Sequence, residues 1–422
     1  MQILIRSARI IDSSSPHNKA VKDILIQSGK IIQIGKSLKP KGKFKEVNIK
    51  NCHVSTGWFD IGAHLCDPGF EHKEDFTSGL KAAQAGGYTG LAVMPNTQPA
   101  LHSKSEIEYV VNKANQSAVD VYPIGSLTKN CEGADITEMY DMHNAGAIAF
   151  SDGLNAIDDA GILLRSLQYV KPFDGLIINQ PSDKGLTGEA MINESAISAQ
   201  LGIKGIPSLA EEIAVARDIE LLKYADSRLH LAQLSSKKSV QLVKAAQSKG
   251  LQLSCGVSAY HLALTDEEIV NFDSNYKVFP PLRQNTDREA LIKGLKAGTI
   301  QVICSGHIPQ DEESKKMEFE YAEYGVINLQ TAFAIANEQL SNILDLDALV
   351  EKFTTNPRKI LNLPQVSVNK NQVANLTLFD PDLNWTFDKS NNASKSNNSP
   401  FLGKQLVGKA LGTVNKGILT LN

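Results

Sequence analysis

The sequence predicts an α/β fold, a (β/α)₈ TIM-type barrel with a small composite β domain built from both chain ends. Through the middle of the chain, short apolar runs alternate with helical patterns in about eight strand–helix units, which is the layout of such a barrel. Strand-like segments with period-2 alternation gather at both ends, and the N-terminal group alone is too small to bury a core. We therefore expect the composite domain at residues 1–54 and 363–422, and the barrel at residues 55–362.

The elements can be assigned in chain order. N-terminal strands are expected in ILIRSARII, DILIQSGKIIQIG and FKEVNIKNCHV, with a turn at Ser28, Gly29 and Lys30. The first barrel strand is GWFDIGAHL, and the other seven are expected near residues 90–95, 119–126, 147–152, 175–180, 228–235, 251–258 and 300–307. Several of the helical patterns between them end in glycine, as helix C-termini often do. The C-terminal strands are expected in NLTLFDP, NWTFD and LVGKALGTVNKGILTLN.

Composition excludes several classes of protein. Hydrophobic residues make up 42% and charged residues 21%, as in soluble globular proteins, and the net charge of -3 favours neither nucleic-acid nor membrane-surface binding. No window holds 18 consecutive apolar residues, and the N-terminus reads as a strand and not as a signal peptide. Five cysteines without CxxC spacing predict no disulfide framework and a reducing, cytoplasmic location.

The stretch GWFDIGAHLCDPG, residues 57–69, is the part of the sequence most suggestive of chemistry. It resembles the Asp-x-His-x-His-x-Arg strand that opens the metal site of the amidohydrolase superfamily, and the following PGFEHKE (68–74) closely resembles the dihydroorotase branch. Further segments similar to dihydroorotases follow in the same order: MPNTQP (94–99), the run 193–219 and KVFPPLR (277–283). The resemblance implies an active site at the strand ends and a β domain packed on the barrel.

Most reactive positions that the resemblance implies are changed in this chain. The remaining metal-binding residues are Asp60, His64 and Asp152. Metal-binding histidines are replaced at Gly62, Gln180 and Gln233, and Gly306 takes the place of the aspartate that acts as general base. A hydrolytic zinc needs several imidazole and carboxylate ligands to activate its water, and proton transfer needs a base. We therefore expect neither a bound metal nor hydrolysis of a cyclic amide.

The positions that the resemblance assigns to the substrate are altered as well. Asn96 remains, whereas the family's arginine, asparagine and histidine are replaced by Cys66, Phe279 and Gln310. The barrel mouth should therefore be less polar, or filled by Phe279. Because an unpaired buried charge is costly, we expect the three remaining metal-binding side chains to be hydrogen-bonded to protein groups or water.

Other histidines and cysteines admit simpler interpretations. His230 and His307 stand beside lost ligands and are expected to be packing groups, and His261 is expected to be structural. A rewired soft-metal site from His64, Cys66 and Cys304 is conceivable. By strand alternation, however, Cys304 lies one layer deeper, where a free cysteine usually behaves as a small apolar residue.

Two functions remain open at this point. The first is a catalytically inactive dihydroorotase-like protein of pyrimidine biosynthesis. The resemblance implies that such a chain is a structural partner of aspartate carbamoyltransferase, or of a catalytic dihydroorotase, within an oligomer. The alternative is an active zinc-dependent dihydroorotase, or a related cyclic amidohydrolase, that interconverts dihydroorotate and N-carbamoyl-aspartate with an atypical site. The low-complexity segment KSNNASKSNNSP (389–400) reads as a linker, but the resemblance implies that part of it is ordered.

Overall fold

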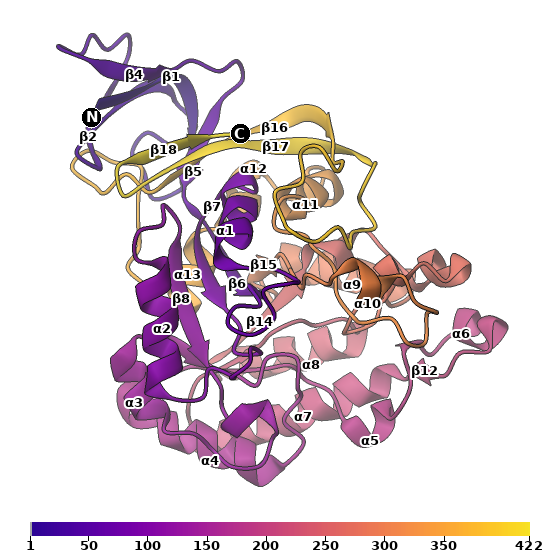
Figure 1. The fold of residues 1–422 in the computed structure, drawn as a ribbon. Helices are drawn as coiled ribbons and strands as arrows, with labels where there is room; N and C mark the ends of the chain where they lie inside the picture. The colour runs from indigo at the N-terminus through magenta and orange to yellow at the C-terminus, as the bar shows by residue number, and fades with distance from the viewer. Residues whose placement is uncertain (1) are drawn as a thin grey trace.

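The computed structural model describes residues 2–422, which form a parallel barrel and a second, mainly antiparallel sheet packed at one end of it (Figure 1). This arrangement confirms the predicted fold class. Helices surround the barrel, and the N-terminal and C-terminal strands lie together at the top of the view. No helix within the described residues is both long and apolar enough to cross a membrane.

The composite sheet joins the two ends of the chain in the order β18-β17-β16-β5-β1-β2-β3, with β4 paired to β1. Strand β5 connects the two halves, because it pairs parallel with β1 and antiparallel with β16. At the β2–β3 hairpin Ser28 (φ 49°) and Gly29 (φ 73°) both have positive φ, as the predicted tight turn requires. The strands are β1 (Gln2–Ile11), β2 (Val21–Gln27), β3 (Lys30–Gly35), β4 (Phe44–Val47), β5 (His53–Thr56), β16 (Leu376–Thr386), β17 (Gln405–Asn415) and β18 (Ile418–Leu421).

Eight parallel strands form the barrel in the order in which they occur along the chain. Its interior is apolar at the level of Phe59, Ile124, Ile178 and Val302, all of which are buried. Because β6 and β15 end the hydrogen-bonded order, they form the seam of the barrel. The strands are β6 (Trp58–Ala63), β7 (Tyr88–Val93), β8 (Asp120–Gly125), β9 (Ala149–Phe150), β10 (Ile177–Asn179), β13 (Leu229–Leu231), β14 (Leu253–Ser258) and β15 (Val302–Cys304).

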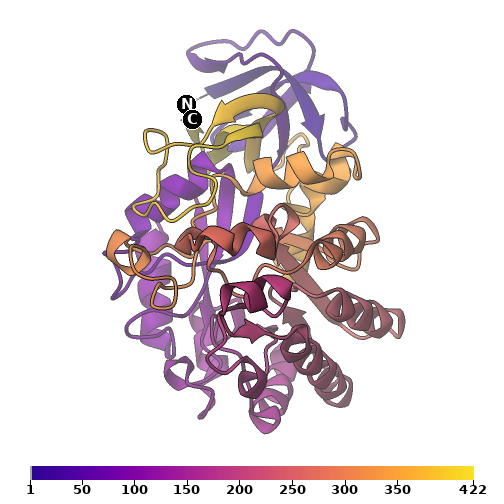
Figure 2. The same cartoon turned by 90° about the vertical axis from the view of Figure 1, so that its right-hand side faces the viewer.

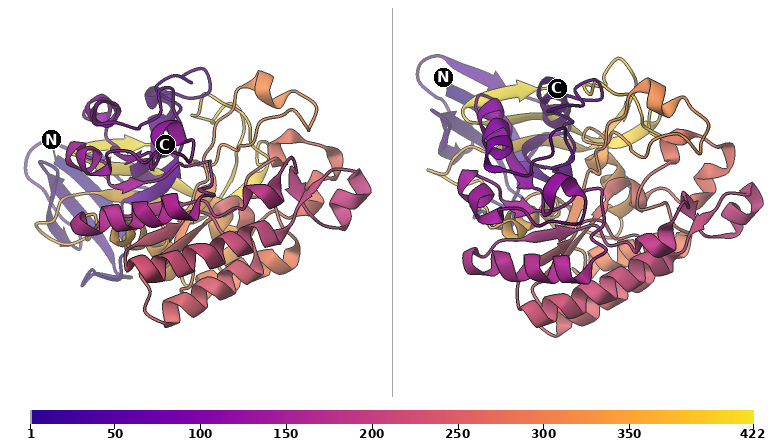
Figure 3. Two further views of the ribbon diagram at one scale, coloured as in Figure 1. Left: turned by 90° about the horizontal axis from the view of Figure 1, so that it is seen from below. Right: turned by 60° about the horizontal axis from the view of Figure 1, so that its bottom comes forward.

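The helices pack side by side around the barrel (Figure 3). Several begin at a side chain that caps the first turn: Asp75, Asp159 and Ser236 each accept a backbone N–H three residues later. The α-helices are α1 (Phe76–Ala85), α2 (Lys104–Ala114), α3 (Met139–Ala145), α4 (Ala160–Val170), α5 (Lys184–Thr187), α6 (Ala196–Leu201), α7 (Ser208–Ala225), α8 (Lys237–Ser248), α9 (Asn285–Lys296), α10 (Glu312–Lys315), α11 (Ala332–Leu340), α12 (Leu346–Glu351) and α13 (Thr355–Ile360).

Long loops after the barrel strands carry the remaining short elements. The chain between β10 and β13 holds the two-stranded sheet of β11 (Ile192–Asn193) and β12 (Gly205–Ile206). Together with α6 it projects from the body of the barrel (Figure 1) and is also visible in the turned view (Figure 2). The 3₁₀ helices are η1 (Lys129–Cys131), η2 (Lys171–Phe173), η3 (Ala259–Leu262), η4 (Asp266–Asn271) and η5 (Ser274–Tyr276).

Candidate functional site

Asp60 lies on β6, is fully buried, and holds the seam of the barrel together. Its two carboxylate oxygens accept hydrogen bonds from the backbone N–H and the hydroxyl of Ser305, each at 2.6 Å. Ser305 directly follows β15, so the bonds join the two seam strands. Burial raises the pKa of Asp60, and the bonds from Ser305 oppose that shift. Both oxygens are therefore engaged within the protein, as expected from the sequence.

His64 follows β6 and is also buried. Its backbone N–H donates to the carbonyl of His307 at 3.0 Å, which adds a second link across the seam. Within residues 2–422 its imidazole makes no hydrogen bond to a protein group, which leaves water as the partner that the prediction allows. Burial lowers the pKa of His64 to about 3, and the nearby His307 adds to the shift. The ring is thus neutral.

An imidazole at Gly62, where the resemblance places one, would require the flexible end of Met94 to move and the backbone to be strained. The φ of Gly62, 97°, is a conformation that side chains disfavour. A Cβ atom at this position would lie 2.7 Å from the terminal methyl of Met94, which occupies the space.

Asp152 follows β9 and is held by one residue of the neighbouring loop. It accepts a hydrogen bond from the backbone N–H of Thr128 at 2.8 Å and another from the Thr128 hydroxyl, as expected. Burial raises its pKa, and the bonds from Thr128 oppose the shift. Asn96 braces the same loop, because its amide donates to the Asp152 carbonyl at 3.0 Å and accepts from the backbone N–H of Leu154 at 3.1 Å. Asn96 therefore fixes the loop shape.

Gln180 and Gln233 lie beside each other at the ends of β10 and β13. The Gln180 amide donates to the Gln233 carbonyl at 3.3 Å, whereas the buried side-chain oxygen of Gln233 has no partner among the described residues. His230, on β13, hydrogen-bonds Ser254 at 2.8 Å, and burial lowers its pKa to about 4. The side chains at this part of the barrel mouth are therefore all uncharged.

Gly306, at the position of the family's general base, is enclosed by its neighbours. A Cβ atom there would lie 2.5 Å from the hydroxyl oxygen of Ser258 and 2.7 Å from Cε1 of Tyr260. Its φ of 63° is again in the left-handed region. The space that an aspartate needs is therefore occupied by the Tyr260 ring and Ser258.

The two cysteines near the mouth are protonated thiols. Burial raises the pKa of both Cys66 and Cys304 to about 12. The sulfur of Cys304 lies 3.7 Å from the Ser258 hydroxyl and 3.4 Å from the Val257 carbonyl. Across residues 2–422, no three His, Cys, Asp or Glu side chains gather closely enough to hold a metal. The combination of His64, Cys66 and Cys304 therefore does not form a site.

Phe279 and Gln310 have become parts of loop packing. Phe279 is half-buried against Ala190 and Ile206 of the projecting segment, with its ring 6.1 Å from that of Tyr324. The Gln310 amide donates to the Tyr324 carbonyl at 2.7 Å. Both side chains stabilise the loop after β15.

A buried pair that was not predicted from sequence is formed by Glu74 and His307, whose Oε2 and Nε2 atoms are 3.6 Å apart. Nδ1 of His307 accepts from the backbone N–H of Asn328 at 3.1 Å, so the ring proton lies on Nε2 and faces the carboxylate. Glu74 also accepts from the hydroxyl of Ser394 and the backbone N–H of Lys395. The low-complexity segment 389–400 is thus ordered at Ser394 and Lys395. The sequence feature that could have indicated this pair is Glu74 of the PGFEHKE motif.

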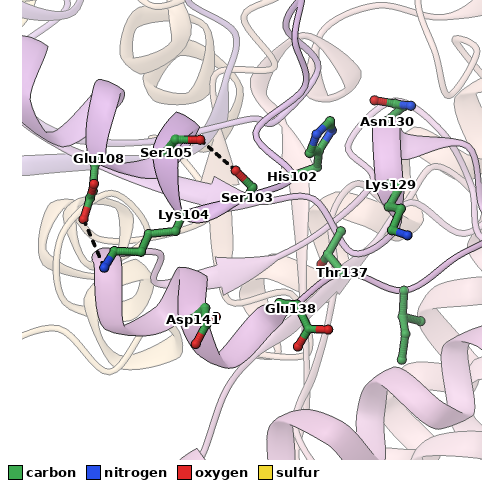
Figure 4. A pocket seen from close by; sticks show the side chains of 11 residues that line it. His102, Ser103, Lys104, Ser105, Glu108, Lys129, Asn130, Thr137, Glu138 and Asp141 are labelled. Atoms are coloured by element: carbon green, nitrogen blue, oxygen red, sulfur yellow. Dashed lines mark hydrogen bonds and ion pairs between the residues drawn. The ribbon is translucent and has the colours of Figure 1, made fainter.

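A hollow of about 670 Å³ opens outside the barrel mouth, between the loops after β7 and β8 (Figure 4). It is lined by residues of both charges, including Lys104, Glu108, Lys129 and Asp141. None of the positions that the resemblance assigns to metal or substrate lines it.

The chain resembles known proteins over its whole length. A family model described as "Dihydro-orotase-like" matches residues 53–239. A dihydroorotase from Geobacter metallireducens is 36% identical over 416 residues, covering 98% of each chain, and one from Geobacter sp. (strain M21) is 37% identical over 419 residues, covering 99% of this chain and 98% of that protein. The chain belongs to the dihydroorotase-like family.

Solved structures agree on the fold of this family member. An L-hydantoinase from Arthrobacter aurescens superposes with a TM-score of 0.87 at 22% identity, covering 100% of this chain and 96% of that chain. A dihydropyrimidinase from Brevibacillus agri gives 0.83 at 21% identity, covering 100% and 95%.

The residues at the strand ends do not fit a hydrolytic zinc centre. Asp60 and Asp152 are engaged by Ser305 and Thr128. His64 is the one imidazole left at the metal-binding positions, and the replaced positions present a glycine or a neutral amide. An amide oxygen does not supply the charge that a zinc ion takes from carboxylate ligands, and it cannot accept a proton at neutral pH. What this dihydroorotase-like chain retains at its strand ends holds the barrel and its loops in place.

Proposed function

We propose that this chain is a catalytically inactive member of the dihydroorotase-like family that acts as a structural partner of aspartate carbamoyltransferase in pyrimidine biosynthesis. The observation that carries the proposal is the use of Asp60 as a seam bond to Ser305. Both carboxylate oxygens bind donors of the barrel, and among the described residues no cluster of His, Cys, Asp or Glu side chains that could hold a metal forms around them.

The loss of the base supports the same proposal. Hydrolysis of a cyclic amide needs a group that removes a proton from the attacking water. At Gly306 no such group exists, and Tyr260 and Ser258 occupy the space. Burial raises the pKa of Tyr260 above its already alkaline ordinary value, so its phenol keeps its proton at neutral pH and does not substitute as a base.

A role through the surface explains why the fold is kept although the site is lost. Most substitutions destabilise a protein, so a chain under no selection would lose core pattern as readily as ligands. The loops after the barrel strands also expose large apolar side chains, which often mark interaction surfaces. They include Leu154, Leu186, Val270, Phe272, Met317 and Tyr321. A catalytic dihydroorotase of the same pathway is the second partner that fits this role.

An active zinc-dependent dihydroorotase with an atypical site is the competing function. It is favoured by the relatives at 35–37% identity, all of which carry the name dihydroorotase. The two functions differ in zinc content and in turnover of dihydroorotate. Both place the protein in the cytoplasm, which fits its five free cysteines.

Analytical ultracentrifugation with the aspartate carbamoyltransferase of the same organism tests the partnership. At about micromolar concentrations of each chain we expect one faster-sedimenting complex, and the transferase assembly should change when this chain is withdrawn. Independent sedimentation, together with transferase assembly and activity unaffected by this chain, would overturn the proposal.

A further inference from the structure

The N-terminal part of the composite sheet carries a strong positive charge. Residues 2–50, here called the basic lobe, hold eleven lysines and arginines and only three acidic residues. A hollow of about 510 Å³ on this lobe is lined by Arg6, Lys22, Lys36 and Lys39. The one acid in the hollow, Asp23, already accepts from Arg6 at 2.8 Å and from two backbone N–H groups at 2.9 Å. The lysines of the hollow therefore face solvent with their charge uncompensated.

Protection of sheet edges does not account for this charge. Lysines on an exposed edge strand prevent sheets from pairing with other chains, and Lys30 on β3 serves that purpose. Lys36, Lys39 and Lys41, however, lie in the loop between β3 and β4, outside any strand. Lys36 and Lys39 line the hollow, and lysines gathered there fit a surface that receives an acidic group.

A ridge of opposite charge lies on the loops beyond β14 and β15. Residues 265–273 and 311–323, here called the acidic ridge, hold ten acidic residues and two lysines. The two segments are packed together, because the Ser274 hydroxyl, next to the first, donates to the Lys315 carbonyl at 2.6 Å, and the rings of Phe272 and Phe319 are 6.2 Å apart.

The ridge is held by internal bonds, and its two lysines do not neutralise its surface. Lys315 is buried, and its ammonium group donates to the carbonyls of Ser274 at 2.6 Å and Glu323 at 2.8 Å. Lys316 is paired with Glu312. Four large apolar side chains stand exposed among the acids: Val270 (42%), Phe272 (47%), Met317 (49%) and Tyr321 (68%).

We propose that the acidic ridge of one copy of this chain binds the basic lobe of a second copy. Complementary charge steers and orients such a contact, and the exposed apolar side chains supply area to bury, with Val21 (44% exposed) on the lobe as their counterpart. Within one molecule the two faces cannot meet, because β1 and α10 lie on opposite sides of the fold (Figures 1 and 3). The inference concerns this chain alone and does not depend on the proposed transferase partner.

Sedimentation velocity on the full chain measures the contact. We expect concentration-dependent self-association at about 50 mM salt that weakens about tenfold or more at about 500 mM, where charge interactions are screened. Two charge-reversed variants sharpen the test. The ridge variant carries Glu267→Lys, Glu318→Lys and Glu320→Lys, and the lobe variant carries Lys22→Glu, Lys36→Glu and Lys39→Glu. The three reversals reduce the formal charge of the ridge from -8 to -2, or that of the lobe from +8 to +2, so each variant alone should self-associate about tenfold or more weakly than the wild type. In their mixture the unchanged lobe of the ridge variant meets the unchanged ridge of the lobe variant, so association should return.

Reversing three charges elsewhere on the surface shows whether any loss of association is specific to the lobe. The control for the lobe variant changes three exposed lysines of α8, Lys237, Lys238 and Lys244, to glutamate. On its own this control should self-associate as the wild-type chain does, since its ridge and its lobe both keep their charge. Circular dichroism verifies that each variant is folded. Monomeric wild-type chain at low salt, self-association of the ridge or lobe variant as tight as that of the wild type, or loss of self-association in the control would each overturn the proposal.

Discussion

Asp60 and Ser305 bind each other across the seam of the barrel through two hydrogen bonds of 2.6 Å. The family resemblance assigns Asp60 to a metal, yet here it joins the first and last barrel strands. The Asp60 carboxylate therefore has a structural role in this chain.

Removing this carboxylate should destabilise the fold. Asp60→Ala leaves a buried N–H and a buried hydroxyl without an acceptor, and we expect a loss of about 2–4 kcal/mol in the free energy of unfolding. Ser305→Ala should cost about 1 kcal/mol, and the double variant should cost less than the sum. Urea unfolding of the four proteins measures this. Asp345→Ala, which removes an exposed helix cap, is the reference at about 1 kcal/mol. An Asp60→Ala cost no larger than that reference would contradict the seam role.

Gly306→Asp should not restore a base. The new side chain meets Ser258 and Tyr260 and requires a positive φ, so we expect a loss of about 3 kcal/mol or more in the free energy of unfolding. Gly298 is a matched control, since its φ is 76° and a Cβ atom there would have no neighbour within 4 Å. Gly298→Asp should therefore lower the free energy of unfolding only by the cost of the backbone conformation, about 1 kcal/mol. Equal losses in chemical denaturation would show that the space at Gly306 is open.

Glu74 and His307 should act as a unit that holds the segment 389–400. Breaking a buried pair by removing one partner costs about 3–5 kcal/mol, and we expect Glu74→Gln and His307→Gln each to approach that loss. Limited proteolysis should then cut the segment faster, because the carboxylate that accepts from Ser394 and Lys395 is removed in Glu74→Gln and is no longer held by the imidazole in His307→Gln. His72→Gln, at an exposed histidine 3.8 Å from Asp311, should change stability by less than about 0.5 kcal/mol. Unchanged cleavage in both pair variants would refute the role.

His230 should make stability depend on pH. Its pKa is lowered by burial from 6.5 to about 4, so between these values the unfolded chain binds a proton that the folded chain does not. Stability is therefore full above about pH 6.5 and is lost as the pH falls toward 4. Between these pH values, His230→Asn should reduce the slope of the free energy of unfolding against pH by up to about 1.4 kcal/mol per pH unit. The measurement is urea unfolding of both proteins at several pH values, and parallel curves would exclude a buried neutral ring.

Much of the fold could be predicted from sequence because its signals are local. The apolar runs indicated the strand positions, and the Ser28–Gly29 turn indicated the β2–β3 hairpin. Likewise, the sequence alone shows that Gly62 and Gly306 carry no side chain. It does not show that Met94 and Tyr260 lie in the space beside them, because this depends on how residues distant in the sequence pack.

Relations between distant segments could not be predicted from sequence. Glu74 meets Ser394 across 320 positions, and no local pattern pairs them. The overall charge of -3 did not indicate the basic lobe and the acidic ridge, because the two cancel in the sum. His64 was expected to hydrogen-bond a protein group or water, and its buried neutral ring has no protein partner among the described residues.

The measurement that tests the account most directly is turnover of dihydroorotate and N-carbamoyl-aspartate by the purified chain with about one to two equivalents of zinc supplied. Asp60→Ala, prepared identically, controls for contaminating enzyme. The account predicts no stoichiometric zinc retained after dialysis and no turnover above that control. Retained zinc together with turnover on the order of 1 s⁻¹ or faster, abolished by Asp60→Ala, would contradict it.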